Sequence, residues 1–179
     1  MIEDKGKRLA RFQNGSPIEI IETLLNSIAN FYNGEIDQAA SSQLWLLVIL
    51  GIHSVALTIS EGIFDKKGLT GFTFFLENFM DEDKEGFKFS EIAKQIHNYR
   101  NVVAHHWLSA SGYDFGIDGG MTKGWEEREN VIYFNPKVYY ETFKNAFGGG
   151  GKIWDYRQLL SPEELETVKA RLLKKYETR

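Results

Sequence analysis

Residues 44–59 are LWLLVILGIHSVALTI, the longest apolar run in the chain. The polar side chains within it are those of His53, Ser54 and Thr58. The run is shorter than the roughly 20 residues that a membrane-spanning helix needs. A helix that is apolar on nearly all sides is typical of the interior of a bundle. The stretch therefore predicts a central buried helix and no membrane span.

Helix signals on both sides of this run predict an all-α bundle of about six helices. Ser16-Pro17-Ile18-Glu19 and Ser161-Pro162-Glu163-Glu164 are capping boxes with proline at the first helical position. Asn135-Pro136 combines a cap and a proline in the same way, and Ser90 is the predicted cap of another helix. The predicted helices cover residues 17–32, 37–64, 70–80, 91–108, 136–147 and a terminal segment from 162.

One segment departs from the helical pattern. Tyr113–Ile117 and Asn130–Phe134 are rich in strand-forming residues, and Gly119-Gly120 lies between them. We expect a small β-hairpin insertion within residues 113–134. No internal repeat is present, so the chain is predicted to be a single domain over residues 1–179.

Composition excludes several classes of function. The chain has no cysteine, which rules out disulfides, thiolate metal sites and thiol catalysis within it. Its net charge is −4, whereas proteins that coat nucleic acid are usually basic. Any contact with RNA must therefore be local. The first fifteen residues lack an apolar segment of the secretory type, which favours the cytoplasm.

The helix predicted over 91–108 carries the sequence RNVVAH at residues 100–105, followed by His106. Arginine binds phosphate oxygens through a planar fork of donors, and histidine transfers protons near neutral pH. These residue types suit cleavage of a phosphodiester without a metal. The site residues predicted from this stretch are Arg100, Asn101 and His105 as catalytic groups, with His97 and His106 as substrate-binding or supporting groups.

Helical geometry places these side chains on different faces. At about 100° per residue, one apolar stripe faces the core, and His97, Asn101 and His105 lie on roughly the opposite side. The stripe consists of Ile92, Ile96, Tyr99, Val103 and Trp107. Arg100 and His105 diverge by about 140°, so one straight helix does not bring them together. Two copies of the helix facing each other across a two-fold axis would bring Arg and His of opposite subunits close.

The string Arg-Asn-x-x-Ala-His on a late helix of a small bundle resembles the HEPN superfamily. Its signature is an Arg and a His separated by four to six residues, usually with a polar residue after the Arg. Arg100, Asn101 and His105 match this signature, and the resemblance covers residues 16–108. It implies a homodimer with the motif helices at the interface and, in active members, metal-independent RNA cleavage that leaves a 2′,3′-cyclic phosphate.

In that reaction the resemblance implies that Arg100 stabilises the phosphoryl charge, that His105 is the general base or acid, and that Asn101 orients one of them or binds the phosphate. It implies no cofactor. Related proteins act in toxin–antitoxin systems, phage defence or other stress responses, which would make a cognate antitoxin a partner.

Other interpretations of the same residues stay open in the sequence. The runner-up function is a non-catalytic HEPN-like dimer that binds a nucleotide, RNA or protein, and a purely structural helical scaffold is the third. His97 also fits a plain surface residue, and His106 a partly buried residue with one hydrogen bond. His53 fits a core histidine with a hydrogen-bond partner. A zinc site is disfavoured because no carboxylate accompanies the histidines at helical spacing.

Overall fold

The computed structural model describes residues 13–106 and 115–177, and for residues 101–106 and 177 it describes the backbone alone. The predicted helical bundle is confirmed for this part of the chain, with a small sheet added to it. The elements, in order, are α2 (Pro17–Phe31), η1 (Tyr32–Ile36), α3 (Asp37–Ser41), α4 (Trp45–Phe64), α5 (Gly68–Phe75), η2 (Leu76–Met80), η3 (Phe89–Ile92), α6 (Ala93–His106), β1 (Phe115–Ile117), β2 (Trp125–Arg128), β3 (Val131–Phe134), α7 (Pro136–Phe147), η4 (Lys152–Leu159) and α8 (Pro162–Glu177). The short elements η1 and η2 are π-helical, whereas η3 and η4 are 3-10 helices.

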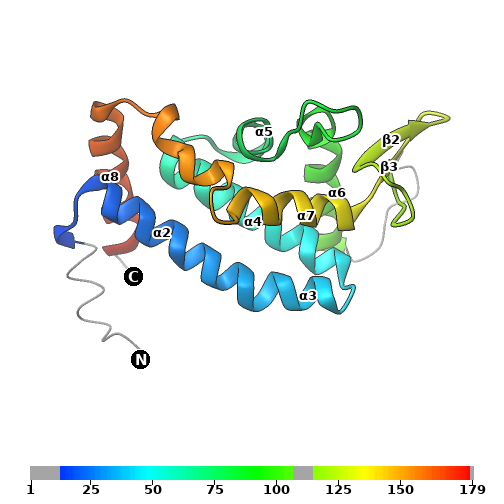
Figure 1. Cartoon of the computed structure of the whole chain (residues 1–179), viewed down its shortest axis with the longest axis horizontal. Helices are drawn as coiled ribbons and strands as arrows, with labels where there is room; N and C mark the ends of the chain where they lie inside the picture. Colours follow the sequence, from blue (N-terminus) through cyan, green and yellow to red (C-terminus); the bar gives the residue numbers. More distant parts are fainter. Residues whose placement is uncertain (1–12, 107–114, 178–179) are drawn as a thin grey trace.

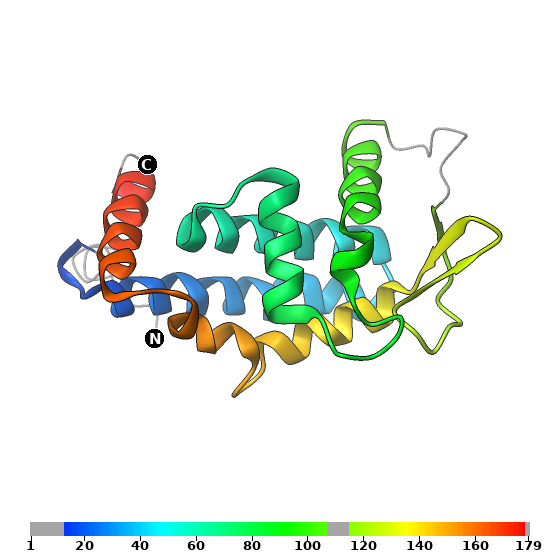
Figure 2. The same ribbon diagram turned by 90° about the horizontal axis from the view of Figure 1, so that it is seen from above.

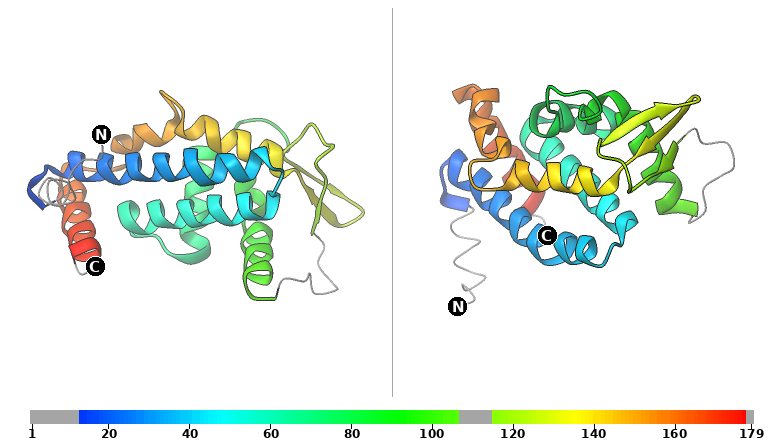
Figure 3. Two further views of the ribbon diagram at one scale, coloured as in Figure 1. Left: turned by 90° about the horizontal axis from the view of Figure 1, so that it is seen from below. Right: turned by 45° about the vertical axis from the view of Figure 1, so that its right-hand side comes forward.

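The bundle is elongated, with the sheet at one end and α8 at the other (Figure 1). The helices α2, α4 and α7 run along the long axis, and α8 and α6 stand across it near the two ends (Figure 3). The central helix α4 packs on α5, α6, α7 and α8. This arrangement follows from the apolar run at residues 44–59, which supplies a helix that neighbours can cover on several sides.

The prediction of a central buried helix is confirmed by α4. Ile49, Ile52 and His53 on this helix are at most 1% exposed. Within the described residues, α4 is the one helix whose length and composition would suffice to cross a membrane. In the bundle, 56% of its most apolar stretch is buried against the rest of the protein. Much of the apolar surface of α4 is therefore covered by neighbouring helices.

The predicted single helix over 37–64 is wrong in one respect. α2 continues through η1 into α3, which ends at Ser41, and α4 begins afresh at Trp45. The chain turns between them because Gln43 adopts a left-handed conformation with φ of 56°. The polar residues Ser41-Ser42-Gln43 were the sequence signal for this turn. Asn33-Gly34 suggested a break in the helix, but the structure continues there as a π-helical turn.

The capping signals were reliable guides to three helix starts. Ser16 accepts a hydrogen bond from the backbone of Glu19 at 3.3 Å, and Glu19 accepts one from the backbone of Ser16 at 2.7 Å. Ser161 and Glu164 form the same pair at the start of α8. The side chain of Asn135 caps α7. These bonds satisfy N–H groups that the first turn of a helix leaves unpaired.

The predicted hairpin is corrected by the sheet, which has the strand order β1-β3-β2. β1 pairs with β3 in parallel, so residues 115–117 and 131–134 are not two arms of a hairpin. The hairpin is formed by β2 and β3, and Glu129 and Asn130 at its tip both have positive φ, as in a type I′ turn. Charged β2 (WEER) lacks a strand-like apolar pattern, which explains why the sequence did not reveal it. Residues 113 and 114 of the predicted strand lie outside the described residues.

Candidate functional site

The predicted motif lies on α6, and the second half of this helix extends past the bundle. α6 crosses α4 and continues beyond it on the side away from α7 (Figures 2 and 3). Its contact with α4 at His97 leaves nine residues, 98–106, after the crossing. At 1.5 Å per residue this part of the helix is about 14 Å long. The motif therefore lies on a projecting helix rather than in the centre of the bundle.

The start of α6 differs from the prediction at Ser90. This residue lies in the 3-10 turn η3, and its side chain does not cap the helix. Instead, both the N–H and the hydroxyl of Ser90 donate to the carboxylate of Asp81. These bonds fix the acidic loop 81–86 to the beginning of α6. Asp81 thus helps to position the helix that carries the motif.

Arg100 lies on the face of α6 that packs against the bundle in its first half. Ala93 and Ile96 are 3% and 0% exposed, and Arg100 follows them at seven and four residues. Such spacing places all three on one side of a helix. Arg100 itself is partly exposed, because the helix has by then passed α4. The side chain of Arg100 therefore leaves the helix on the side that faces the bundle.

The other predicted catalytic residues are located by their backbone. Asn101, His105 and His106 belong to α6, but their side chains lie outside the described part of the structure. The assignments of His105 and Asn101 as catalytic groups, and of His106 as a supporting group, remain predictions. The helix from Ala93 to His106 contains both Arg100 and His105.

The structure brings together two histidines that are 44 residues apart in the chain. Nε2 of His53 on α4 lies 2.9 Å from Nδ1 of His97 on α6, a hydrogen bond between two imidazoles. The prediction that His53 is a core histidine with a partner is confirmed, since it is 0% exposed. The prediction that His97 faces away from the core is wrong, and so is its alternative as a plain surface residue. Both failed because α6 crosses α4, so that a second face of the helix, next to that of Ile96, is also covered.

A third helix completes the surroundings of this pair. The ring of Phe72 on α5 lies 4.4 Å from the ring of His53 and 6.2 Å from that of His97, measured between centroids. The signal that the sequence offered was a histidine inside an apolar helix, since a buried imidazole requires a polar partner. The chain has four histidines, and the three besides His53 are on the motif helix. The sequence therefore offered His97 as one possible partner of His53.

The electrostatic setting keeps both imidazoles neutral. Burial lowers the pKa of His53 to about 3, with smaller contributions from the positive charge of Arg100 and from His97. Burial also lowers the pKa of His97, and Arg100 acts in the same direction. A cation and a low dielectric both oppose a further positive charge. At neutral pH the pair therefore carries no charge beside the Arg100 guanidinium.

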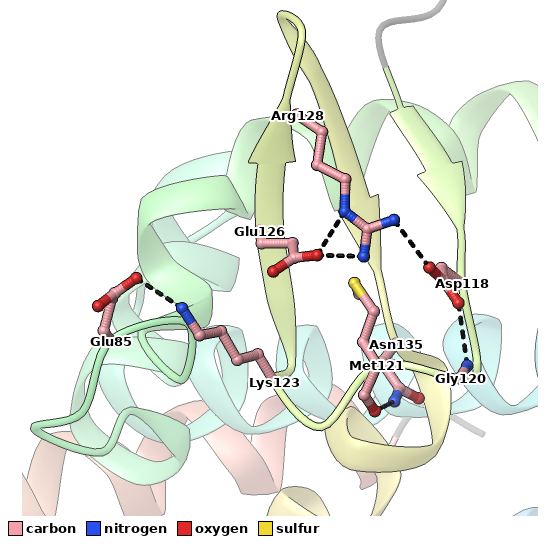
Figure 4. Close-up of polar contacts among 8 residues, drawn as sticks. All are labelled: Glu85, Asp118, Gly120, Met121, Lys123, Glu126, Arg128 and Asn135. Carbon is pink, nitrogen blue, oxygen red and sulfur yellow. Dashed lines mark hydrogen bonds and ion pairs between the residues drawn. The ribbon is translucent and has the colours of Figure 1, made fainter.

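The cations of the sheet have partners within the chain, as Figure 4 shows. Arg128 binds the carboxylates of Asp118 and Glu126, and its guanidinium lies 4.9 Å from the ring centre of Tyr133. Lys123 binds Glu85 at 2.6 Å. Because carboxylates already occupy the donors of Arg128, this arginine is a poor candidate for a phosphate ligand. It instead holds the hairpin to the loop that follows β1.

In the part of the chain that the structure describes, neither metal ligands nor two surface hollows point to another centre. No group of three or more His, Asp or Glu side chains able to hold a metal occurs among the described residues. A hollow of about 320 Å³ lies where α4, α5 and α8 meet, and one of about 220 Å³ lies beside the acidic loop and Trp125. Neither hollow is lined by Arg100, His53 or His97.

Comparison of the chain with protein-family models, with curated proteins and with solved structures finds no match.

Proposed function

We propose that this protein is a metal-independent endoribonuclease of the HEPN type. The observation that carries the proposal is the position of Arg100, which lies on a projecting helix beside two neutral imidazoles, with His105 further along the same helix. A cation on a partly exposed surface next to a neutral, partly exposed imidazole suits one or two phosphate groups. It does so even in a chain with a net charge of −4.

The proposed reaction is an internal transfer of the phosphoryl group. The RNA 2′-oxygen forms a bond to phosphorus while the bond from phosphorus to the 5′-oxygen breaks, which leaves a 2′,3′-cyclic phosphate and a 5′-hydroxyl. His105 takes the proton of the 2′-hydroxyl or supplies the proton of the 5′-oxygen, and solvent completes the exchange. Arg100 stabilises the negative charge on the phosphoryl oxygens, the type of contribution that is usually largest.

The proposed active form is a homodimer in which two copies of α6 face each other. Leu44, the residue before α4, and Leu47 in its first turn are each 50% exposed. The projecting half of α6 lies on the side of α4 away from α7 (Figure 2). Half-exposed leucines at the start of α4, the helix that α6 crosses, are suited to burial against a second copy. This contact would bring Arg100 of one subunit toward His105 of the other.

The test is RNA cleavage in the presence of EDTA. Wild-type protein is expected to cut single-stranded RNA and leave cyclic-phosphate ends, whereas Arg100→Ala and His105→Ala are expected to reduce the rate by about 10²-fold or more. Arg128→Ala is the matched control, because it removes an arginine that is paired within the sheet, and it should cleave like wild type. Equal cleavage by wild type, Arg100→Ala and His105→Ala would disprove the proposal. Binding without cleavage would favour the non-catalytic alternative.

A further inference from the structure

We propose that His53 is a positioning residue that holds His97 as a neutral imidazole with its proton on Nε2, and that His97 in this form donates a hydrogen bond to an RNA phosphate beside Arg100. The assignment of RNA as the ligand rests on the proposed function. The assignment of the tautomer does not, because it follows from the contacts of the two rings alone.

The first step concerns which nitrogen carries the proton in the bond between the rings. Nε2 of His53 and Nδ1 of His97 are 2.9 Å apart, so one of them donates and the other accepts. The remaining ring nitrogen of His53, Nδ1, is buried and has no hydrogen-bond partner among the described residues. That nitrogen must then be either a buried unpaired donor or a buried unpaired acceptor.

The two cases differ in cost. If Nδ1 of His97 donates, the proton of His53 lies on its own Nδ1, which is a buried N–H without an acceptor. If Nε2 of His53 donates, its Nδ1 is a bare acceptor. Buried N–H groups without partners are rarer in proteins than acceptors with unused capacity. The second arrangement is therefore favoured, and it leaves Nδ1 of His97 as the acceptor and Nε2 of His97 as the N–H donor.

The same bond opposes protonation of His97. A doubly protonated His97 would have to donate from Nδ1, which would force the proton of His53 onto its buried Nδ1. This cost adds to burial and to Arg100, both of which lower the pKa of His97. Among the described residues, Arg100 is the charged group that acts on both rings. Lys94 lies three residues before His97 on α6, α5 carries no titratable side chain, and Glu61 on α4 lies two turns from His53. None of these groups is a carboxylate close to His97 that would favour its charged form.

The second step concerns what the Nε2–H group of His97 can bind. Since Nδ1 points to buried His53, Nε2 on the far side of the ring points away from it, and His97 is partly exposed. Residues three apart on a helix are neighbours, with Cβ atoms about 5–6 Å apart. The positive charge of Arg100 acts on His97 and lowers its pKa, so in this proposal the Nε2–H group and the guanidinium donate to the same ligand. A phosphodiester oxygen accepts from both, whereas a cation would be repelled.

The tautomer is tested by NMR of the full-length ¹⁵N-labelled protein, in which two-bond ¹H–¹⁵N correlations identify the protonated nitrogen of each ring. We expect His97 to carry its proton on Nε2 and to have a pKa below that of an ordinary histidine, because burial and Arg100 both lower it. In His53→Phe, which lacks the donor, the midpoint of His97 titration should rise. A proton on Nδ1 of His97, or titration of His97 near pH 6.5 in the wild type, would overturn the inference.

Binding is tested with a short single-stranded RNA that carries 2′-O-methyl groups and so cannot be cleaved. We expect His97→Phe to weaken binding about tenfold, the effect of one hydrogen bond to a charged group. His97→Gln, a neutral donor of similar reach, should retain most of the affinity. Melting curves establish that both variants fold.

The salt dependence separates a neutral donor from a cation. His97→Phe should leave the slope of log affinity against log salt unchanged, whereas Arg100→Ala should reduce it by about 0.7 for each phosphate that the arginine neutralises. A reduced slope in His97→Phe would show that His97 is charged in the complex, against the inference. RNA cleavage by the wild type with unaltered binding by His97→Phe would overturn this inference alone. Failure of the wild type to bind RNA would overturn the ligand together with the proposed function.

Discussion

The imidazoles of His53 and His97 are joined by a hydrogen bond of 2.9 Å that links the centre of the bundle to the projecting motif helix. His53 belongs to α4, the most apolar helix, and His97 lies three residues before Arg100. A hydrogen bond requires a particular alignment of donor and acceptor, so this bond favours one rotation of α6 about its axis. The orientation of Arg100 therefore depends on a residue, His53, that lies outside the motif.

The low pKa of His53 predicts a specific loss of stability in acid. The folded pKa is about 3 and the ordinary value is 6.5, so between these values the unfolded chain binds a proton that the folded chain does not. The contribution of His53 to the free energy of unfolding is then fully present above about pH 6.5. It is lost as the pH decreases, by up to about 1.4 kcal/mol per pH unit. Urea unfolding between about pH 7 and pH 5 should show this slope in the wild type and a smaller one in His53→Gln. Carboxylates contribute equally to both proteins, so identical slopes would refute the prediction.

A second prediction concerns the contact between the sheet and the start of α6. An alanine Cβ at position 124 would lie 2.6 Å from Cε1 of Phe89, which is 0% exposed and packs edge to face on Phe134 and Tyr139. Because this ring has no room to move, Gly124→Ala should destabilise the protein by about 1–3 kcal/mol. Gly119→Ala is the control, since nothing lies within 4 Å of its Cβ position. Chemical denaturation of both variants measures the difference, and equal stabilities would contradict the packing described.

Much of the bundle was predictable because its signals are local. The capping boxes at Ser16 and Ser161 and the cap at Asn135 are short patterns with a direct hydrogen-bonding cause, and all three helices begin where they indicate. The parallel pairing of β1 with β3 was not predictable, since register between strands depends on contacts distant in sequence.

The candidate site was predictable to the same extent. A helix containing Arg100 and His105 follows from sequence, as does burial of His53. That His97 is the partner of His53 required knowledge of how α6 crosses α4, because helical periodicity describes one helix and not the angle between two. The predicted pairing of Arg100 and His105 across a dimer likewise depends on how two helices meet, which the periodicity of one helix does not describe.

A third prediction tests the proposed dimer surface. Leu47 is 50% exposed, and a glutamate there would place a charge in the contact between two copies. Leu47→Glu should raise the dimer dissociation constant at least tenfold, equivalent to about 1.4 kcal/mol. Leu159→Glu is the control, because Leu159 is 41% exposed but lies near α8 at the opposite end of the bundle. Light scattering over a range of concentrations should show a dimer for the wild type and for Leu159→Glu. A monomeric wild type would rule out the proposed active form.

The last prediction asks whether the active site is shared between subunits. If each site takes Arg100 from one chain and His105 from the other, a heterodimer of Arg100→Ala and His105→Ala contains one site with both residues intact. Random mixing makes half of the dimers mixed, each with one of its two sites intact, so activity should return to about a quarter of the wild-type value. If both residues act within one chain, no intact site forms and the mixture should stay inactive. The two variants are refolded together or coexpressed, and cyclic-phosphate ends are quantified against each variant alone. Because Arg100 and His105 diverge by about 140° on one helix, restoration is the expected outcome.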